Sequence, residues 1–153
     1  DVCSSDLEML EAVIGEVKLS PAVLSPLKEG EAAASPGMKY RHYAPDAKVI
    51  VVCGGIKEVT NRIRREVEYY ESRGFSCTIL ATEQTQSFYH GKNYVIIGDR
   101  NVPETLCAGL FSALRCLSGQ TDIIFAEEQP TDGAGLAFMN RILRAAGFKT
   151  IEA

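Results

Sequence analysis

The hydrophobic pattern becomes regular at about residue 47. From there to the end, short apolar runs alternate with segments in which apolar residues recur every three or four positions. Residues 49–53 form a continuous run rich in β-branched side chains, which is typical of a strand buried on both faces of a sheet. We expect further strands at 75–81, 94–97 and 123–126, with a short fifth strand at 148–151.

Three segments between these runs have the spacing of amphipathic helices. Residues 56–73 place Val59, Ile63 and Val67 on one face, and Gly74 follows as a stop. A second helix is expected from Pro103, a residue suited to a first helical turn, and a third at 134–146. Buried strands that alternate with helices indicate a parallel sheet covered on both faces. The predicted fold class of residues 47–153 is therefore α/β, a Rossmann-like open parallel sheet.

The first 46 residues follow a different pattern. Residues 7–14 carry four apolar side chains at helical spacing, and one short helix cannot fold alone. We read residues 8–16 as the end of a domain whose remainder is missing. Residues 17–46 contain four of the six prolines and are predicted to be an interdomain linker. Residues 1–7 resemble the translation of a sequencing adaptor, and we exclude them from fold reasoning.

Composition and charge exclude several function classes. The chain has 153 residues, is 46% hydrophobic, and carries a formal net charge of -4. No apolar run approaches the roughly 20 residues of a membrane helix, so we expect no membrane association. The expected cytoplasmic location rests on the cysteines. The net acidity argues against a free-standing nucleic-acid binder. The five cysteines lack Cys-x-x-Cys spacing, so we expect reduced, mostly buried thiols and no metal.

The predicted sheet gathers acidic side chains at one edge. Ligands bind beyond the carboxyl ends of strands in open parallel sheets, and the side chains expected there are Glu83, Asp99, Glu127 and Glu128. Like charges make this a poor phosphate site, and Gly54-Gly55 does not form a dinucleotide-binding fingerprint. A divalent cation is one possibility, but we interpret these groups as solvated loop carboxylates. Asp132 is interpreted as the N-cap of the last helix.

The densest polar cluster lies in the linker. Residues 35–45 read SPGMKYRHYAP, with three basic-type side chains and two tyrosines between two prolines. An extended segment of this kind can lie in a groove and present alternate side chains to it. Lys39 and Arg41 can pair with phosphate or carboxylate, and Tyr40 and Tyr43 can cover a base or ribose. The alternative is a solvated linker without a binding role.

The sequence of this cluster resembles a known motif. SPGMKYRHYAP resembles the interdomain linker of the long-form threonylcarbamoyl-AMP synthases, a specific motif of eleven residues. Residues 133–146 resemble the closing helix of that family's C-terminal domain. Residues 10–17 resemble the end of its YrdC-like catalytic domain. The resemblance covers nearly the whole chain from Glu8.

The resemblance implies what the parent protein does. A catalytic domain, missing here, uses ATP with Mg to condense L-threonine and bicarbonate into threonylcarbamoyl-AMP, releasing pyrophosphate, for tRNA N6-threonylcarbamoyladenosine. The family's linker covers the catalytic pocket and contacts the nucleotide. The matching positions are Gly37, Lys39, Tyr40, Arg41, His42 and Tyr43.

The resemblance also implies which catalytic groups this chain lacks and which partners it binds. We expect the fragment itself to hold no catalytic residue, no metal and no cofactor, and to be inactive alone. The expected partners are the catalytic domain in cis, together with the threonylcarbamoyl transferase or tRNA.

Two other readings stay open, a free-standing Rossmann-type small-molecule binding module and a protein-interaction domain. The absent glycine fingerprint weighs against the first. The net acidity weighs against docking of tRNA, but not against docking of a protein.

We predict that residues 47–153 fold as an independent unit, because the strand and helix pattern is complete within them. Limited proteolysis should cut within residues 17–46 and leave the downstream core intact, as mass spectrometry of the products would show. Early cleavage inside residues 93–126 would contradict the domain assignment.

Overall fold

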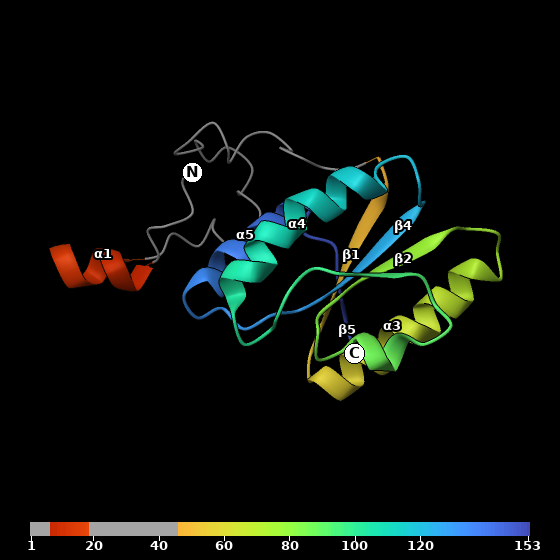
Figure 1. Cartoon of the computed structure of the whole chain (residues 1–153), viewed down its shortest axis with the longest axis horizontal. Helices are drawn as coiled ribbons and strands as arrows, with labels where there is room; N and C mark the ends of the chain where they lie inside the picture. The colour runs from red at the N-terminus through yellow and green to blue at the C-terminus, as the bar shows by residue number, and fades with distance from the viewer. Residues whose placement is uncertain (1–6, 19–45) are drawn as a thin grey trace.

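The computed structural model describes residues 7–18 and 46–153 (Figure 1). In the first of these segments, helix α1 (Leu7–Ile14) occupies the residues expected from their helical spacing. Its apolar side chains Val13 and Ile14 are 83% and 69% exposed. In the second segment a five-stranded sheet is covered by helices.

The sheet is parallel throughout and has the strand order β3-β2-β4-β1-β5. Every residue of the central strand β4 and of its neighbour β2 is buried. This confirms the predicted fold class, including the short fifth strand. The strands are β1 (Lys48–Cys53), β2 (Cys77–Ala81), β3 (Tyr94–Ile96), β4 (Ile123–Glu127) and β5 (Thr150–Glu152).

Helices cover both faces of the sheet (Figure 1). Helix α3 (Ile56–Glu71) and the short 3-10 helix η2 (Gln86–Tyr89) lie on one face. Helices α4 (Pro103–Leu117) and α5 (Ala134–Ala145) lie together on the other. Only the single turn of η2 is helical between β2 and β3, in keeping with the polar sequence there.

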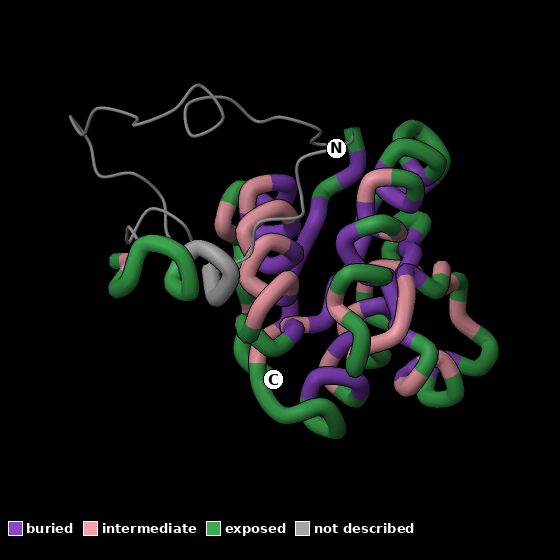
Figure 2. The backbone as a smooth tube through the Cα atoms, turned by 60° about the vertical axis from the view of Figure 1, so that its left-hand side comes forward, coloured by how far each residue is buried: buried purple, intermediate pink, exposed green. Residues whose placement is uncertain are grey.

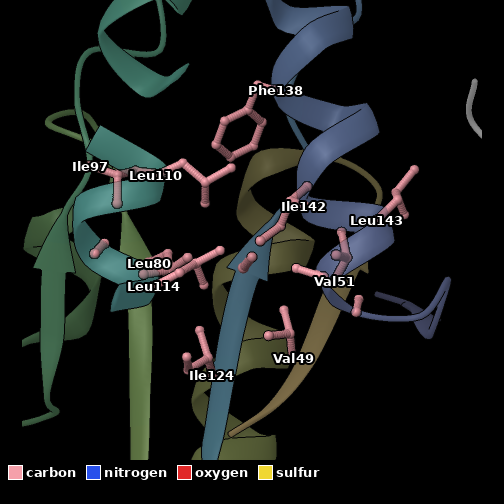
Figure 3. Close-up of a cluster of buried hydrophobic side chains, with 14 of the residues drawn as sticks. Val49, Val51, Leu80, Ile97, Leu110, Leu114, Ile124, Phe138, Ile142 and Leu143 are labelled. Atoms are coloured by element: carbon pink, nitrogen blue, oxygen red, sulfur yellow. The ribbon is translucent and has the colours of Figure 1, made fainter. Parts of the chain in front are cut away.

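The alternation of side chains along the strands divides the core in two. Odd-numbered positions of β1 pack under α4 and α5, and even-numbered positions pack under α3. In Figure 2 the buried backbone of the sheet lies between the helical layers. Figure 3 shows the ring of Phe138 of α5 pointing toward Leu110 of α4, with Ile142 of α5 near Val51 and Leu114 of α4 beside Leu80. Each fully buried aliphatic or aromatic side chain contributes roughly 1.5–3 kcal/mol.

The strand order places a topological switch point between two neighbouring strands. Strand β1 continues into α3 on one face, whereas the adjacent β4 continues into α5 on the opposite face. The two connections therefore leave the sheet in opposite directions at the carboxyl ends of β4 and β1. Open parallel sheets bind ligands at such a switch point.

Helix α4 passes unusually close to the chain that follows β3. A Cβ atom added at Gly109 would collide with the carbonyl group of the buried Ile97. Glycine is required at this helical position because only a bare Cα fits against that backbone.

We predict that Gly109→Ala destabilises the domain, although alanine is the better helix former by about 1 kcal/mol. Overpacking against backbone costs about 1–3 kcal/mol and should reverse the sign. Urea unfolding measures the free energy of unfolding directly. Ser112→Ala, on the exposed face of the same helix, is the control and should be neutral or slightly stabilising. A Gly109→Ala protein more stable than wild type would disprove the close approach.

Candidate functional site

The carboxyl end of β4 holds a buried carboxylate. Glu127 is the last residue of that strand and is 1% exposed. The hydroxyl of Tyr89, itself fully buried on η2, donates a hydrogen bond of 2.7 Å to Glu127 Oε1. Glu127 Oε2 is buried and has no hydrogen-bond partner among the described residues.

Arg100 lies over this carboxylate. Its Nη1 atom donates to the carbonyl oxygen of Glu128 and to Gln129 Oε1, each at 2.9 Å, and lies 4.0 Å from Glu127 Oε2. Arg100 follows β3, and β2 separates β3 from β4 in the sheet. The side chain therefore spans the carboxyl end of β2 to reach β4.

Burial dominates the electrostatics of the pair. It raises the pKa of the Glu127 carboxyl, while the Thr85 and Tyr89 hydroxyls and the Arg100 guanidinium act in the opposite direction. The pKa of Tyr89 is raised by burial and by the nearby Glu127 charge. Tyr89 therefore stays protonated and serves as a hydrogen-bond donor.

Reciprocal hydrogen bonds hold the loop that carries Arg100. Gln84 Nε2 donates to Asp99 Oδ1 at 2.6 Å, and the Arg100 backbone N–H donates to Gln84 Oε1 at 2.9 Å. The Asn101 N–H also donates to Asp99 Oδ1, at 2.7 Å. These contacts join the loops after β2 and β3, and they hold the backbone of Arg100 in place.

A second contact joins the carboxyl ends of β4 and β1 at the switch point. The N–H of Gly54 donates to Glu128 Oε2 at 2.9 Å. Gly54 has a φ of +132°, which L side chains rarely adopt. Beside it, burial and then Glu128 and Glu152 raise the pKa of the Cys53 thiol to about 11. The thiol is therefore protonated near neutral pH and is a poor nucleophile.

These contacts correct part of the expected picture. The predicted residues do gather at one sheet edge, but Glu127 is buried and is not a solvated loop carboxylate. Asp99 and Glu128 are committed to the hydrogen bonds above. The sequence interpretation missed Arg100 and Tyr89, although Arg100 directly follows the Gly98-Asp99 pair at a strand end. Among the described residues, no group of three or more His, Cys, Asp or Glu is placed to hold a metal ion.

Two smaller expectations are wrong. The N-cap of α5 is Gly133, which has a φ of +52° and no side-chain capping bond, and not Asp132. The helix itself begins at Ala134, as expected. Cys116 is exposed, whereas Cys77 and Cys107 are buried as expected and Cys53 is intermediate. Cys116 lies on the outer face of the apolar α4, which periodicity around it did not reveal.

The linker residues singled out from the sequence lie outside the described residues. They are Gly37, Lys39, Tyr40, Arg41, His42 and Tyr43. Their role stays a prediction. In the described part of the chain, none of the helices has the length and hydrophobicity to cross a bilayer.

Comparison with known proteins matches the chain to one protein family. The family described as threonylcarbamoyl-AMP synthase, C-terminal domain, matches residues 6–147. The chain is 38% identical over 146 residues to the threonylcarbamoyl-AMP synthase of Bacillus subtilis, and 37% identical over 147 residues to that of Pyrococcus abyssi. Each match covers 95% of this chain but only 40% and 41% of the relatives. The chain thus spans about two fifths of their length.

Solved structures are similar over the same extent. P. abyssi Sua5 complexed with L-threonine matches with a TM-score of 0.83 and 36% identity, over 97% of this chain and 42% of that chain. A variant of that protein, with a histidine and the following tyrosine replaced by alanine, matches with a TM-score of 0.82 and 35% identity. It covers 97% of this chain and 41% of that one. A C-terminal Sua5 domain from Pyrococcus horikoshii is covered completely by 72% of this chain, with a TM-score of 0.57 and 31% identity.

We predict that Glu127 makes the domain less stable as pH rises. Its raised native pKa means that the folded protein binds a proton more tightly than the unfolded chain does. The stability contributed by the protonated form is complete below the usual glutamate pKa of about 4.3 and is lost as pH rises through the native pKa. Glu127→Gln cannot titrate, so its free energy of unfolding should not show this fall.

The measurement is urea unfolding of wild type and Glu127→Gln across the acidic and neutral range, with their difference plotted against pH. Glu83→Gln, exposed at the same sheet edge, should follow the wild-type curve. A difference between wild type and Glu127→Gln that does not change with pH would show that the carboxyl titrates alike in both states.

Proposed function

The chain belongs to the threonylcarbamoyl-AMP synthase family, and from that membership we propose that it supplies the accessory C-terminal domain and the active-site-covering linker of such a synthase. The parent enzyme would convert L-threonine, bicarbonate and ATP into threonylcarbamoyl-AMP, pyrophosphate and water. The adenylate would then serve the formation of N6-threonylcarbamoyladenosine in tRNA.

The observation that carries the proposal is the match of the family's C-terminal domain to residues 6–147, in a chain that spans about two fifths of its relatives. The condensation is therefore assigned to a catalytic domain outside these residues, which also binds ATP with Mg. The thiols at the sheet support this assignment. Burial raises the pKa of both Cys53 and Cys77 to about 11, so neither is an activated nucleophile.

The linker is assigned the role of a cover over the nucleotide. Its motif holds the single His-Tyr pair of this chain, His42-Tyr43. A solved variant of the P. abyssi relative replaces a histidine and the next tyrosine, which supports a role for such a pair. Arg41 is suited to phosphate because its guanidinium can donate two parallel hydrogen bonds. Tyr43 is suited to contact the base or ribose.

The C-terminal domain is assigned a supporting role. It carries the far end of the linker on a rigid sheet, because β1 begins at Lys48, directly after the linker. Its first partner is the catalytic domain in cis, and the threonylcarbamoyl transferase or tRNA is a candidate second partner. We place the protein in the cytoplasm, where tRNA is modified.

We predict that Arg41→Ala, His42→Ala and Tyr43→Ala slow adenylate formation in the full-length enzyme. A charge-assisted hydrogen bond contributes about 1.5–3 kcal/mol, so losing one present only in the closed state should slow the reaction about 10- to 100-fold. The melting temperature should barely change, because such surface substitutions usually stay within about 0.5 kcal/mol. Pyrophosphate release and thermal unfolding are measured on the same samples.

Matched controls come from exposed residues of the C-terminal domain. Arg64→Ala and His90→Ala remove the same side-chain types from exposed positions and should leave the rate near wild type. Glu127 is unsuitable as a control because it is buried. The 153-residue chain alone should release no pyrophosphate in a threonine- and bicarbonate-dependent manner. Fully active linker variants would rule out the covering role, and synthase activity of the chain alone would rule out the assignment of the chemistry to another domain.

A further inference from the structure

One buried oxygen in the C-terminal domain has no role in the proposed synthase function. Glu127 Oε2 has less than 1 Å² of accessible surface and no hydrogen-bond partner in the described part of the chain. Nearly all buried polar atoms in native proteins are hydrogen-bonded, and an exception points to a water, an ion or a ligand. The oxygen lies at the carboxyl end of β4, beside the switch point where open sheets bind ligands.

Arg100 is also only partly used. A guanidinium has five N–H donors on three nitrogens, and within the described residues only its Nη1 has partners. Its Nε and Nη2 atoms have none there. The Arg100 side chain as a whole is 20% exposed. Unused donors of Arg100 thus lie close to a carboxylate oxygen that has an ion-pair contact at 4.0 Å but no hydrogen bond.

The pair of charges selects the chemistry of the ligand. A phosphate or other pure anion would be repelled by the Glu127 charge. A pure cation would be repelled by Arg100, which lies 4.0 Å from the same oxygen. A metal ion would need more ligands than the described residues bring together. A small zwitterion satisfies both groups, because its ammonium donates to a carboxylate and its carboxylate accepts from a guanidinium.

We propose that the carboxyl end of β4 is a binding site for an α-amino acid. The ligand ammonium donates to Glu127 Oε2, and the ligand carboxylate accepts from Nε and Nη2 of Arg100. Arg100 lies over the carboxylate, so entry requires its side chain to move outward while the loop backbone stays fixed by Gln84 and Asp99. Tyr89 keeps its hydrogen bond to Oε1 and holds the Glu127 carboxylate in place.

The site is separate from the synthase chemistry assigned to the catalytic domain, and it stands or falls independently of that proposal. The test is isothermal titration calorimetry of the 153-residue chain, which contains none of the catalytic pocket on that assignment. The probes are L-threonine and glycine, which carry both charges. N-acetyl-L-threonine and L-threonine methyl ester each lack one charge. We expect saturable binding of one zwitterion per chain, and at least tenfold weaker binding of both single-charge analogues.

Variants identify where binding occurs. Arg100→Gln should weaken binding of L-threonine at least tenfold. Arg100→Lys should recover part of the loss, because lysine restores the positive charge but not the paired Nε and Nη2 donors. Arg64→Gln, an exposed arginine on α3, is the matched control and should bind as wild type does. Glu127→Gln should weaken binding similarly. Its circular dichroism spectrum checks that it is folded, and Arg100→Gln carries the test if it is not.

Three results would overturn the proposal. These are no binding of either zwitterion, equal binding of the single-charge analogues, and an unchanged affinity of Arg100→Gln. Each would mean that the buried oxygen is met by water alone. None of them bears on pyrophosphate release by the full-length enzyme, so a failed amino-acid site remains distinguishable from a failed synthase assignment.

Discussion

The architecture depends on burying β4 and β1 side by side in the middle of a parallel sheet. A strand in this position needs apolar side chains on both faces, which is why 49–53 and 123–126 are continuous apolar runs and not alternating ones. Side chains at alternate positions of each strand pack into two separate core clusters, one under α4 and α5 and the other under α3. Because these strands connect to helices on opposite faces, the same pairing places the topological switch point at their carboxyl ends.

Glu127 is the exception that this burial creates. It ends a strand whose other residues are apolar, and its carboxylate lies inside the domain with them. The groups that meet it come from three other segments: Tyr89 from η2, Arg100 from the loop after β3, and Gln129 beyond β4 through Arg100. Removing one member of such a cluster leaves a buried polar group exposed to a low dielectric, so the cluster ties these loops together.

The chain therefore divides its polar chemistry between two places of different character. The motif of residues 35–45 concentrates recognition chemistry in one short segment, as expected for a cover over a pocket formed elsewhere. The C-terminal domain instead assembles its polar groups from distant segments on a rigid sheet edge. The first kind of site can be recognised as a contiguous sequence motif. The second cannot, because its residues are far apart in the chain.

The sequence by itself determined the elements, the fold class and the family, because helical and strand periodicities and an eleven-residue motif are local properties. It could not determine the strand order β3-β2-β4-β1-β5, since nothing local in the sequence says which runs pair. For the same reason it could not show that Arg100 reaches Glu127 across β2, or that one of four acidic residues at the sheet edge is buried. It also assigned the N-cap of α5 to Asp132, although the chain enters the helix at Gly133 with a positive φ. Burial, ion pairing and pKa depend on neighbours that are distant in sequence, and only the tertiary structure brings these together.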